Sequence, residues 1–398
     1  MEQEWQTDWK EPVVIVPKTA HYSWFRAASL LGIGKKNLVR VDVDEEFSMV
    51  PSALDAVLND CLQHKRPIWQ IVTVVGTTEF GSVDPVHEIV GVRDGFAKRG
   101  LYAPIHVDGA YGGYFATMFA KGASSAESDA DQSSFAETTS QDTQPALGYH
   151  FASEPWLRDA FHGIRGADSI TVDPHKAGYT PYGAGAIVLK HGFLKDLVAE
   201  TAPYCLDRED TTQVGSSSPQ LGKFILEGSK PGAVAAAVWF SHRLIPLNQD
   251  GYGRQLSILC RIARVFDQLV SQRSNVFSLF RPHTNIVGLM ARKAGITRKS
   301  QLNDLNEHLA VRFGVQEVSS IQSYDYLISR TTIAPDSACV SSDVYLNTLT
   351  DDVEQLTILR LVFMNRWVEG KDFAGQTYLK DFLDTLEKEV TDYVVAVD

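Results

Sequence analysis

The sequence predicts an α/β protein with a mainly parallel, doubly wound sheet in a large domain and a small α+β layer at the carboxy-terminal end. Short apolar runs alternate with amphipathic stretches at the spacing of strand–helix–strand units over roughly the first half of the chain. A long amphipathic stretch at 251–273 then precedes a region of mixed strand and helix patterns. We therefore expect a large domain at 1–250 and a linking helix with a small domain at 251–398.

Length and composition are those of a globular enzyme. The 398 residues can form two cores, and 44% hydrophobic with 22% charged residues is ordinary for such a protein. The net charge of −12, with no basic cluster, argues against a nucleic-acid partner.

Cysteine usage and the amino-terminal residues indicate the compartment. The four cysteines are scattered and form no C-x-x-C pair, so neither a disulfide framework nor a metal site is predicted. The first twelve residues, MEQEWQTDWKEP, lack the apolar core of a signal peptide. No apolar run approaches the ~20 residues that span a bilayer. We expect a soluble cytoplasmic protein with no membrane partner.

Continuous apolar runs and amphipathic stretches define the elements of the large domain. The run at 68–75 is typical of a parallel strand that is covered on both faces. The expected strands are 13–17, 38–43, 68–75, 105–108, 169–172 and 186–189. The expected helices are 25–31, 49–62, 86–99, 151–166 and 233–247.

The carboxy-terminal region begins with the expected helix at 251–273, which places five apolar side chains on one face: Leu256, Leu259, Ile262, Phe266 and Leu269. The patterns beyond it predict strands at 284–291 and 356–364 and helices at 299–313 and 379–394.

Residues 121–147 interrupt this alternation. Ser, Thr, Asp, Glu and Gln dominate the segment, so it cannot offset the entropy that ordering would cost. We expect a disordered surface loop within the large domain.

The stretch at 169–190, SITVDPHKAGYTPYGAGAIVLK, places Lys176 just past an apparently buried strand, beside His175 and before glycine turns. A partly desolvated amine at the rigid edge of a sheet suits imine chemistry with a carbonyl cofactor. Most lysines at strand ends are simply solvated, so a second feature is needed.

That second feature is IHVDGAYGG at 105–113, in which an apolar strand delivers Asp108 at its end. Pyridoxal phosphate needs an acid that faces its ring nitrogen, so that the ring stays protonated and accepts electrons. A strand-end aspartate and a strand-end lysine together are the pair that this chemistry requires.

With HVDGAYGG followed by DPHK, the chain resembles the group II pyridoxal-phosphate-dependent decarboxylases of amino acids, and most closely the tyrosine decarboxylases. The resemblance extends over nearly the whole chain. It implies the type I pyridoxal-phosphate fold, also called aspartate-aminotransferase-like, and pyridoxal 5′-phosphate as cofactor. It also implies a homodimer that converts an L-amino acid to the amine and carbon dioxide.

The resemblance assigns roles around the cofactor ring. Lys176 would carry the cofactor and Asp108 would face its ring nitrogen. His21, in the motif TAHYSW, would stack on one face of the ring, and Ala110 would pack against the other. His21 could instead cap the helix that follows it.

Further roles rest on weaker matches. Thr78, in the turn GTTEFG, would contact the cofactor, and His175 would lie near its phosphate or the substrate. Tyr204 would protonate the product carbon from a loop, or is an ordinary surface tyrosine. Arg360 would meet the substrate carboxylate or form a structural ion pair. Residues 225–232 resemble a segment that crosses toward the neighbouring subunit.

The chain departs from the family at its amino end. Family members carry there a dimer-building segment and a glycine- and threonine-rich turn at a helix N-terminus, which binds the cofactor phosphate. No such turn precedes His21. A truncated gene model, a split protein and a degenerate homologue are the three explanations.

Three functions remain open from the sequence. The first is an aromatic L-amino-acid decarboxylase with a tyrosine-like preference, and the second is a glutamate-type decarboxylase of the same fold. The third is a non-catalytic homologue that binds or regulates a full-length paralogue.

Overall fold

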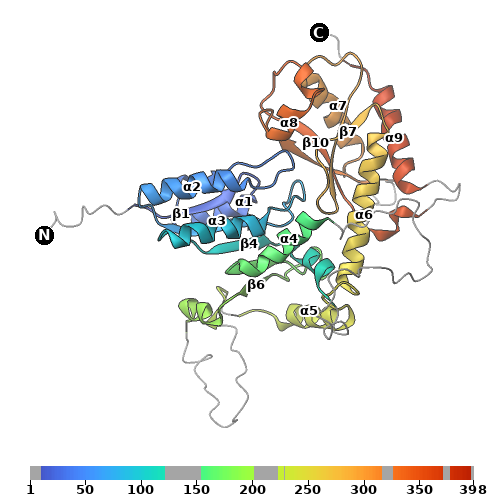
Figure 1. The fold of residues 1–398 in the computed structure, drawn as a ribbon. Coiled ribbons are helices and arrows are strands. Elements are labelled where there is room, and N and C mark those ends of the chain that lie inside the picture. The colour runs from blue at the N-terminus through green and yellow to red at the C-terminus, as the bar shows by residue number, and fades with distance from the viewer. Residues whose placement is uncertain are drawn as a thin grey trace.

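The computed structural model describes residues 10–121, 154–200, 223–227, 229–315, 326–370 and 377–395. Two sheets organise this part of the chain, and the long helix α6 (Tyr252–Ser271) runs between them (Figure 1). The predicted insert at 121–147 lies outside the described residues except for Lys121. No helix in the described ranges has the length and apolar character needed to cross a membrane.

The first sheet has the strand order β2-β1-β3-β4-β5-β6 in the described residues. The strands β1 to β5 are parallel, whereas β6 pairs antiparallel with β5. The strands are β1 (Val13–Pro17), β2 (Leu38–Val41), β3 (Ile68–Val74), β4 (Ile105–Gly109), β5 (Ser169–Val172) and β6 (Ala186–Leu189). The mainly parallel α/β architecture predicted from the sequence is confirmed.

Both faces of the sheet centre are buried, which explains its continuous apolar runs. In β1, Val13 and Ile15 belong to one core, whereas Val14 and Val16 belong to another on the opposite face. Helices α2 (Pro51–Gln63), α3 (Val86–Lys98) and α4 (Pro155–Gly163) cover the first face, and α1 (Tyr22–Leu30) covers the second.

The second sheet is antiparallel, with the order β7-β8-β10-β9. Its strands are β7 (Val276–Ser278), β8 (Ile286–Ala291), β9 (Ser329–Ile333) and β10 (Leu356–Val362). Helices α6 and α7 (Lys299–Arg312) pack on it, and α9 (Tyr378–Asp392) packs beside both helices. The short α8 (Ala338–Ser342) completes this region together with the 3-10 turns η9 (Leu346–Thr348) and η10 (Arg366–Glu369).

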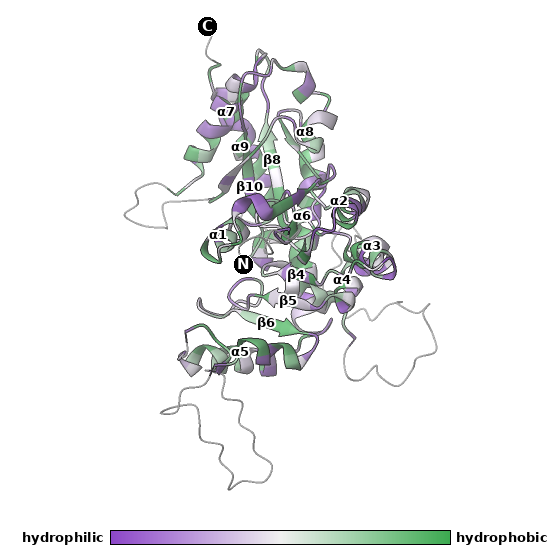
Figure 2. Cartoon of the chain, turned by 90° about the vertical axis from the view of Figure 1, so that its left-hand side faces the viewer, coloured by the Kyte–Doolittle hydropathy of each residue, from purple (hydrophilic) through white to green (hydrophobic). Residues whose placement is uncertain are grey.

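The side of the first sheet beyond β5 differs from expectation. Helix α5 (Gly232–Leu244) lies beyond β6 in both views (Figures 1 and 2), and none of its residues is buried. The sequence predicts a buried strand ahead of Lys176, but β5 is half-buried and β6 is mostly exposed. The prediction of a buried strand is wrong for the described chain, because β6 is the edge of the sheet.

Short 3-10 segments join the larger elements. The segment η2 (Gly112–Phe119) follows β4 and packs against α6. Further 3-10 segments in the described ranges before α5 are η1 (Lys35–Asn37), η5 (Ile164–Gly166) and η6 (Gly192–Val198).

Candidate active site

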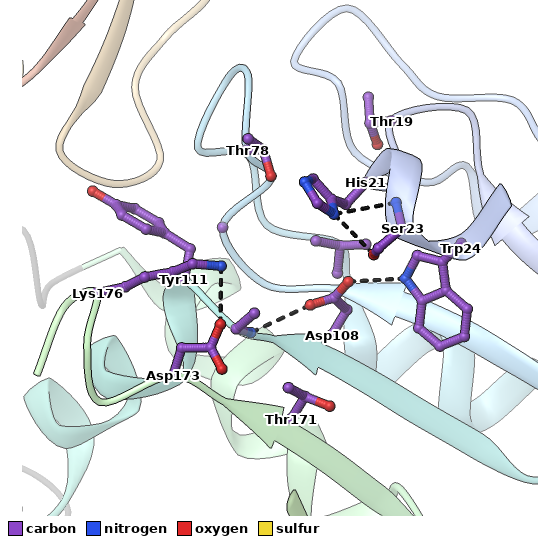
Figure 3. Close-up of a pocket in the computed structure, with 13 residues that line it drawn as sticks. Thr19, His21, Ser23, Trp24, Thr78, Asp108, Tyr111, Thr171, Asp173 and Lys176 are labelled. Carbon is purple, nitrogen blue, oxygen red and sulfur yellow. Dashed lines mark hydrogen bonds and ion pairs between the residues drawn. The ribbon is translucent and has the colours of Figure 1, made fainter. Parts of the chain in front are cut away.

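A pocket of about 320 Å³ opens at the carboxyl ends of the parallel strands. This is the edge at which open α/β sheets bind ligands, because the strand ends and the loops that follow them converge there. Five of the side chains singled out from the sequence line the pocket (Figure 3): His21, Thr78, Asp108, Ala110 and Lys176.

Lys176 stands on a turn early in the connection from β5 to β6, where its backbone N–H donates to the Asp173 carbonyl at 3.0 Å. Its Nζ lies 3.0 Å from Oδ2 of Asp173, and about one third of its side chain is exposed. The turn packs closely because residue 178 is glycine: a Cβ there would lie 2.6 Å from both the Pro174 carbonyl oxygen and the Tyr114 ring. The backbone therefore holds the amine firmly at the pocket edge beside a carboxylate.

Asp108 ends β4, and both of its carboxylate oxygens are engaged. The indole Nε1 of Trp24 donates to Oδ2 at 2.9 Å, and the backbone N–H of Ala110 donates to Oδ1 at 3.3 Å. The glycines that follow permit this close turn, since a Cβ on Gly112 would lie 2.0 Å from the carbonyl oxygen of Val75. The motif thus fixes an oriented carboxylate at the base of the pocket.

His21 is the N-cap of α1, as one interpretation of the sequence predicts, and it also lines the pocket. Its stacking on the cofactor ring stays a prediction. Its Nδ1 accepts the backbone N–H of Ser23 at 3.3 Å and lies 2.8 Å from Oγ of Ser23. A backbone N–H can only donate, so Nδ1 is the acceptor and the neutral ring carries its proton on Nε2.

Thr78 lies on the turn after β3, which Gly76 begins with a φ of 81°. Arg360 of β10 reaches this turn from the other sheet: its Nη2 donates to the Thr78 carbonyl at 2.6 Å and its Nε to the Glu79 carbonyl at 3.1 Å. Burial lowers the pKa of Arg360 from its usual value. Arg360 does not line the described pocket, and its Nη1 also donates to Oγ of Ser329 at 3.3 Å. Its meeting with a substrate carboxylate stays a prediction.

His175 does not line this pocket. The ring of His175 stacks on Tyr182 with centroids 4.7 Å apart, and its Nδ1 lies 2.6 Å from the Ala184 carbonyl oxygen. His175 therefore supports the lysine turn from beside the pocket. Tyr204 lies outside the described residues, and its role stays a prediction.

The pocket also contains residues for which the sequence gave no role. Trp24 and Asp173 stand inside the motifs TAHYSW and DPHK, but the motifs alone do not say which side chains face a cavity. Tyr111 donates from its hydroxyl to Oδ1 of Asn285 at 2.7 Å, and burial raises its pKa well above the usual value. No sequence signal distinguishes these side chains from core residues.

The lining fits pyridoxal phosphate. An amine and an oriented carboxylate face one cavity, whose volume is at the lower end of the ~300–1,000 Å³ usual for ligand sites. The buried Oγ1 of Thr19 lines the same cavity and has no hydrogen-bond partner within the described chain. A buried hydroxyl of this kind normally has a partner, and a polar ligand would supply it.

Comparison with known proteins identifies the family. Residues 2–131 and 149–292 match the family model described as the pyridoxal-dependent decarboxylase conserved domain. The chain belongs to this family, and pyridoxal 5′-phosphate is its cofactor, as expected from the sequence.

Individual relatives agree with this assignment. The L-tyrosine decarboxylase of Enterococcus faecium is 31% identical over 395 residues, which cover 96% of this chain and 62% of that protein. The L-aspartate decarboxylase of Thermococcus kodakarensis is 28% identical over 284 residues, or 71% of this chain and 59% of that protein. The chain thus spans about three fifths of the length of these curated relatives.

A solved structure confirms the fold. The crystal structure of Oryza sativa TDC with PLP and tryptamine matches with a TM-score of 0.66 at 16% identity, covering 96% of this chain and 63% of that one. The predicted type I pyridoxal-phosphate fold is confirmed.

Proposed function

We propose that this pocket decarboxylates an aromatic L-amino acid, with a tyrosine-like preference, to the amine and carbon dioxide. One observation carries the proposal: Lys176, Asp108 and His21, from three separate segments, converge on a single pocket. Membership of the pyridoxal-dependent decarboxylase family supports it.

Each of these residues has a defined task. When bound, pyridoxal phosphate supplies an electron sink for the charge that remains after carbon dioxide leaves. Lys176 would anchor the cofactor, and Asp108 would hold the proton on its ring nitrogen. His21 would lie against the ring, in an orientation that Ser23 fixes through Nδ1. Ala110 would pack against the ring's other face.

Asp173 prepares Lys176 for this task. An ammonium cannot attack a carbonyl carbon, so Nζ must lose a proton before it forms a bond. Oδ2 of Asp173 lies 3.0 Å from Nζ and can hold that proton, or pair with the charged form of the amine. The two residues belong to the same turn, so their separation is set locally.

The charges around the pocket support an aromatic substrate over an acidic one. A substrate with a side-chain carboxylate needs a second cation besides the one that meets its α-carboxylate. Among the described lining residues, Lys176 is the only lysine or arginine. The guanidinium of Arg360 is occupied by the backbone carbonyls of Thr78 and Glu79. The name of the Enterococcus faecium relative points the same way.

A substrate panel tests this proposal. The purified chain, loaded with pyridoxal phosphate, is given L-tyrosine, L-tryptophan, L-glutamate and L-aspartate, and carbon dioxide release is measured. We expect release from L-tyrosine above all. Release from the acidic amino acids but not from L-tyrosine would support the glutamate-type alternative. No release from any of them, with co-purification of a longer related chain, would support the non-catalytic one.

We also propose that the protein acts as a homodimer in the cytoplasm. Neighbouring elements on the β6 side of the first sheet expose large apolar side chains: Ile187, Val188, Phe193, Leu197, Trp239, Phe240 and Leu244. Figure 2 shows much of α5 and β6 in the colour of hydrophobic residues. A gathering of exposed apolar side chains favours an interface, and homodimer interfaces are the most apolar class. The free thiols of Cys61, Cys260 and Cys339 suit a reducing compartment.

A further inference from the structure

Helix α1 carries two side chains of the pocket one turn apart. His21 caps its start, and Trp24 follows three residues later. Side chains at this spacing lie on the same face of a helix. In Figure 3 the indole nitrogen of Trp24 points at the carboxylate of Asp108, and His21 lies on the same side of the pocket. One short helix therefore reaches both the histidine position and the strand-end aspartate.

The contact between Trp24 and Asp108 settles the orientation of the carboxylate. Nε1 of Trp24 donates to Oδ2 at 2.9 Å, a distance typical of a good hydrogen bond. The Ala110 N–H holds Oδ1 at 3.3 Å. A carboxylate with a donor at each oxygen cannot rotate freely about its χ2 torsion. Without the indole N–H, only the longer and weaker contact would remain.

Trp24 is itself held in place. Its ring meets the ring of His106 edge-on, with centroids 5.6 Å apart. His106 lies two residues before Asp108 on β4, and its two nitrogens contact Oγ of Ser169 at 2.8 Å and Oγ1 of Thr171 at 3.1 Å. Burial lowers the pKa of His106, so this ring stays neutral near pH 7. The indole thus rests on an uncharged, hydrogen-bonded support.

We propose that Trp24 is a positioning residue for the ring nitrogen of the cofactor. Its indole N–H holds the Asp108 carboxylate in the orientation that receives the protonated nitrogen of pyridoxal phosphate. The inference rests on the proposed function, since it requires the cofactor to bind in this pocket with its ring nitrogen toward Asp108.

Ligand titration with Trp24→Phe tests it, because this variant keeps an aromatic ring and removes the N–H. Dissociation constants are measured for pyridoxal phosphate and for its 1-deaza analogue, which carries carbon in place of the ring nitrogen. We expect binding of pyridoxal phosphate to weaken about tenfold, as for the loss of a hydrogen bond to a charged group. Binding of the analogue stays unchanged, since Asp108 has no ring nitrogen to meet.

Trp156→Phe is the matched control. Nε1 of Trp156 also donates to a carboxylate, Oε2 of Glu154 at 3.0 Å, but Trp156 does not line the pocket. This variant should bind both ligands as the wild-type protein does. A second variant, Trp24→His, retains a ring N–H and should keep more of the preference for pyridoxal phosphate than Trp24→Phe does.

Three results would overturn the inference. Equal weakening of both ligands in Trp24→Phe would mean a general loss of pocket structure. Unchanged binding of pyridoxal phosphate would mean that Asp108 needs no help from the indole. If the wild-type protein binds neither ligand, the proposed function fails and the inference fails with it, and this outcome is distinct from the other two.

Discussion

Strands β8 and β6 have similar apolar sequences but opposite surroundings. Every residue of β8, IVGLMA, is buried, whereas three of the four residues of β6, AIVL, are exposed. β8 lies between β7 and β10 beneath α6 and α7, whereas β6 is the edge of its sheet and borders α5, which buries none of its residues. An apolar run therefore predicts a strand, but its burial depends on which elements cover it.

The difference bears on the active site, because the turn that carries Lys176 joins β5 to β6. The second sheet has a closed core within one chain, and the large domain is closed on its α2, α3 and α4 side. The β6 side ends in exposed apolar surface at the strand that follows the Lys176 turn. A second copy that covers this surface would also shelter the lysine turn.

The largest expected effect compares two isoleucines, one in each strand. Ile286→Ala in β8 removes a side chain that is 0% exposed, and should lower the free energy of unfolding by about 4 kcal/mol. Ile187→Ala in β6 truncates a side chain that is 63% exposed, and should cost below about 0.5 kcal/mol in the monomer. Urea unfolding at low protein concentration measures both. Equal losses would remove the distinction between the two regions.

On the side of the first sheet that α2, α3 and α4 cover, the burial of one carboxyl group should make the free energy of unfolding depend on pH. Asp84 is fully buried and accepts hydrogen bonds from the Met49 and Val74 amides and from Thr73, yet burial raises its pKa to about 6. A raised folded-state pKa gives stability that is present below the unfolded value of 3.8 and is lost as the pH rises through about 6.

The wild-type protein should therefore lose about 2 kcal/mol relative to Asp84→Asn between pH 4 and pH 7. The free energy of unfolding is measured for both proteins across this pH range, and the value for Asp84→Asn is subtracted from that of the wild-type protein. The contributions of the other carboxyl groups cancel in this difference. A difference that does not change with pH would show that Asp84 is not desolvated in the folded chain.

A charge introduced into the exposed apolar surface on the β6 side should weaken the proposed homodimer. Trp239→Glu in α5 should raise the dissociation constant of the proposed homodimer at least tenfold, because it puts a charge into an apolar contact. Val344→Glu, at an even more exposed apolar residue near the second sheet, is the control and should leave the dimer intact. Sedimentation over a range of concentrations checks this. A monomeric wild-type protein would contradict the proposal.

The smallest expected effect concerns Arg360, whose hydrogen bonds link the second sheet to the turn after β3. Arg360→Lys keeps the charge but replaces the planar guanidinium, whose separate nitrogens reach the Thr78 and Glu79 carbonyls, with a single ammonium, so it should cost about 1 kcal/mol of stability. Thr78 lines the pocket, so the affinity for pyridoxal phosphate should fall as well. Arg330→Lys, on the neighbouring strand β9, offers a matched comparison. Unchanged affinity in Arg360→Lys would mean that the turn keeps its shape without the bridge.

The centre of the parallel sheet could be predicted from the sequence because β1 and most of β3 are buried and read as apolar runs. Element ends were less predictable: α1 begins at Tyr22, three residues before its apolar pattern, because the His21 side chain caps it. β7 has only three residues and β9 reads SRTTI, so neither gives a clear pattern. The exposure of β6 depends on its neighbours, which a local pattern does not report.

The strand-end residues of the site could be predicted for a geometric reason. Asp108 lies in the last two residues of β4 and Lys176 follows the adjacent parallel strand β5, and the carboxyl ends of the two strands meet at one edge. The contact between Trp24 and Asp108 depends on the angular position of a helix over the sheet, and spacing alone does not set that. Arg360 reaches a turn 281 residues earlier in the chain, and no local motif predicts such a contact.

The absorption spectrum of the purified chain with added pyridoxal phosphate tests the central claim most directly. We expect a visible band from lysine-bound cofactor in the wild-type protein and in Lys190→Ala, whose lysine lies at the end of β6 outside the pocket. Lys176→Ala should lack the band, because no other described lysine lines the pocket. The same band in Lys176→Ala, or its absence from the wild-type protein, would contradict the assignment of this pocket as the cofactor site.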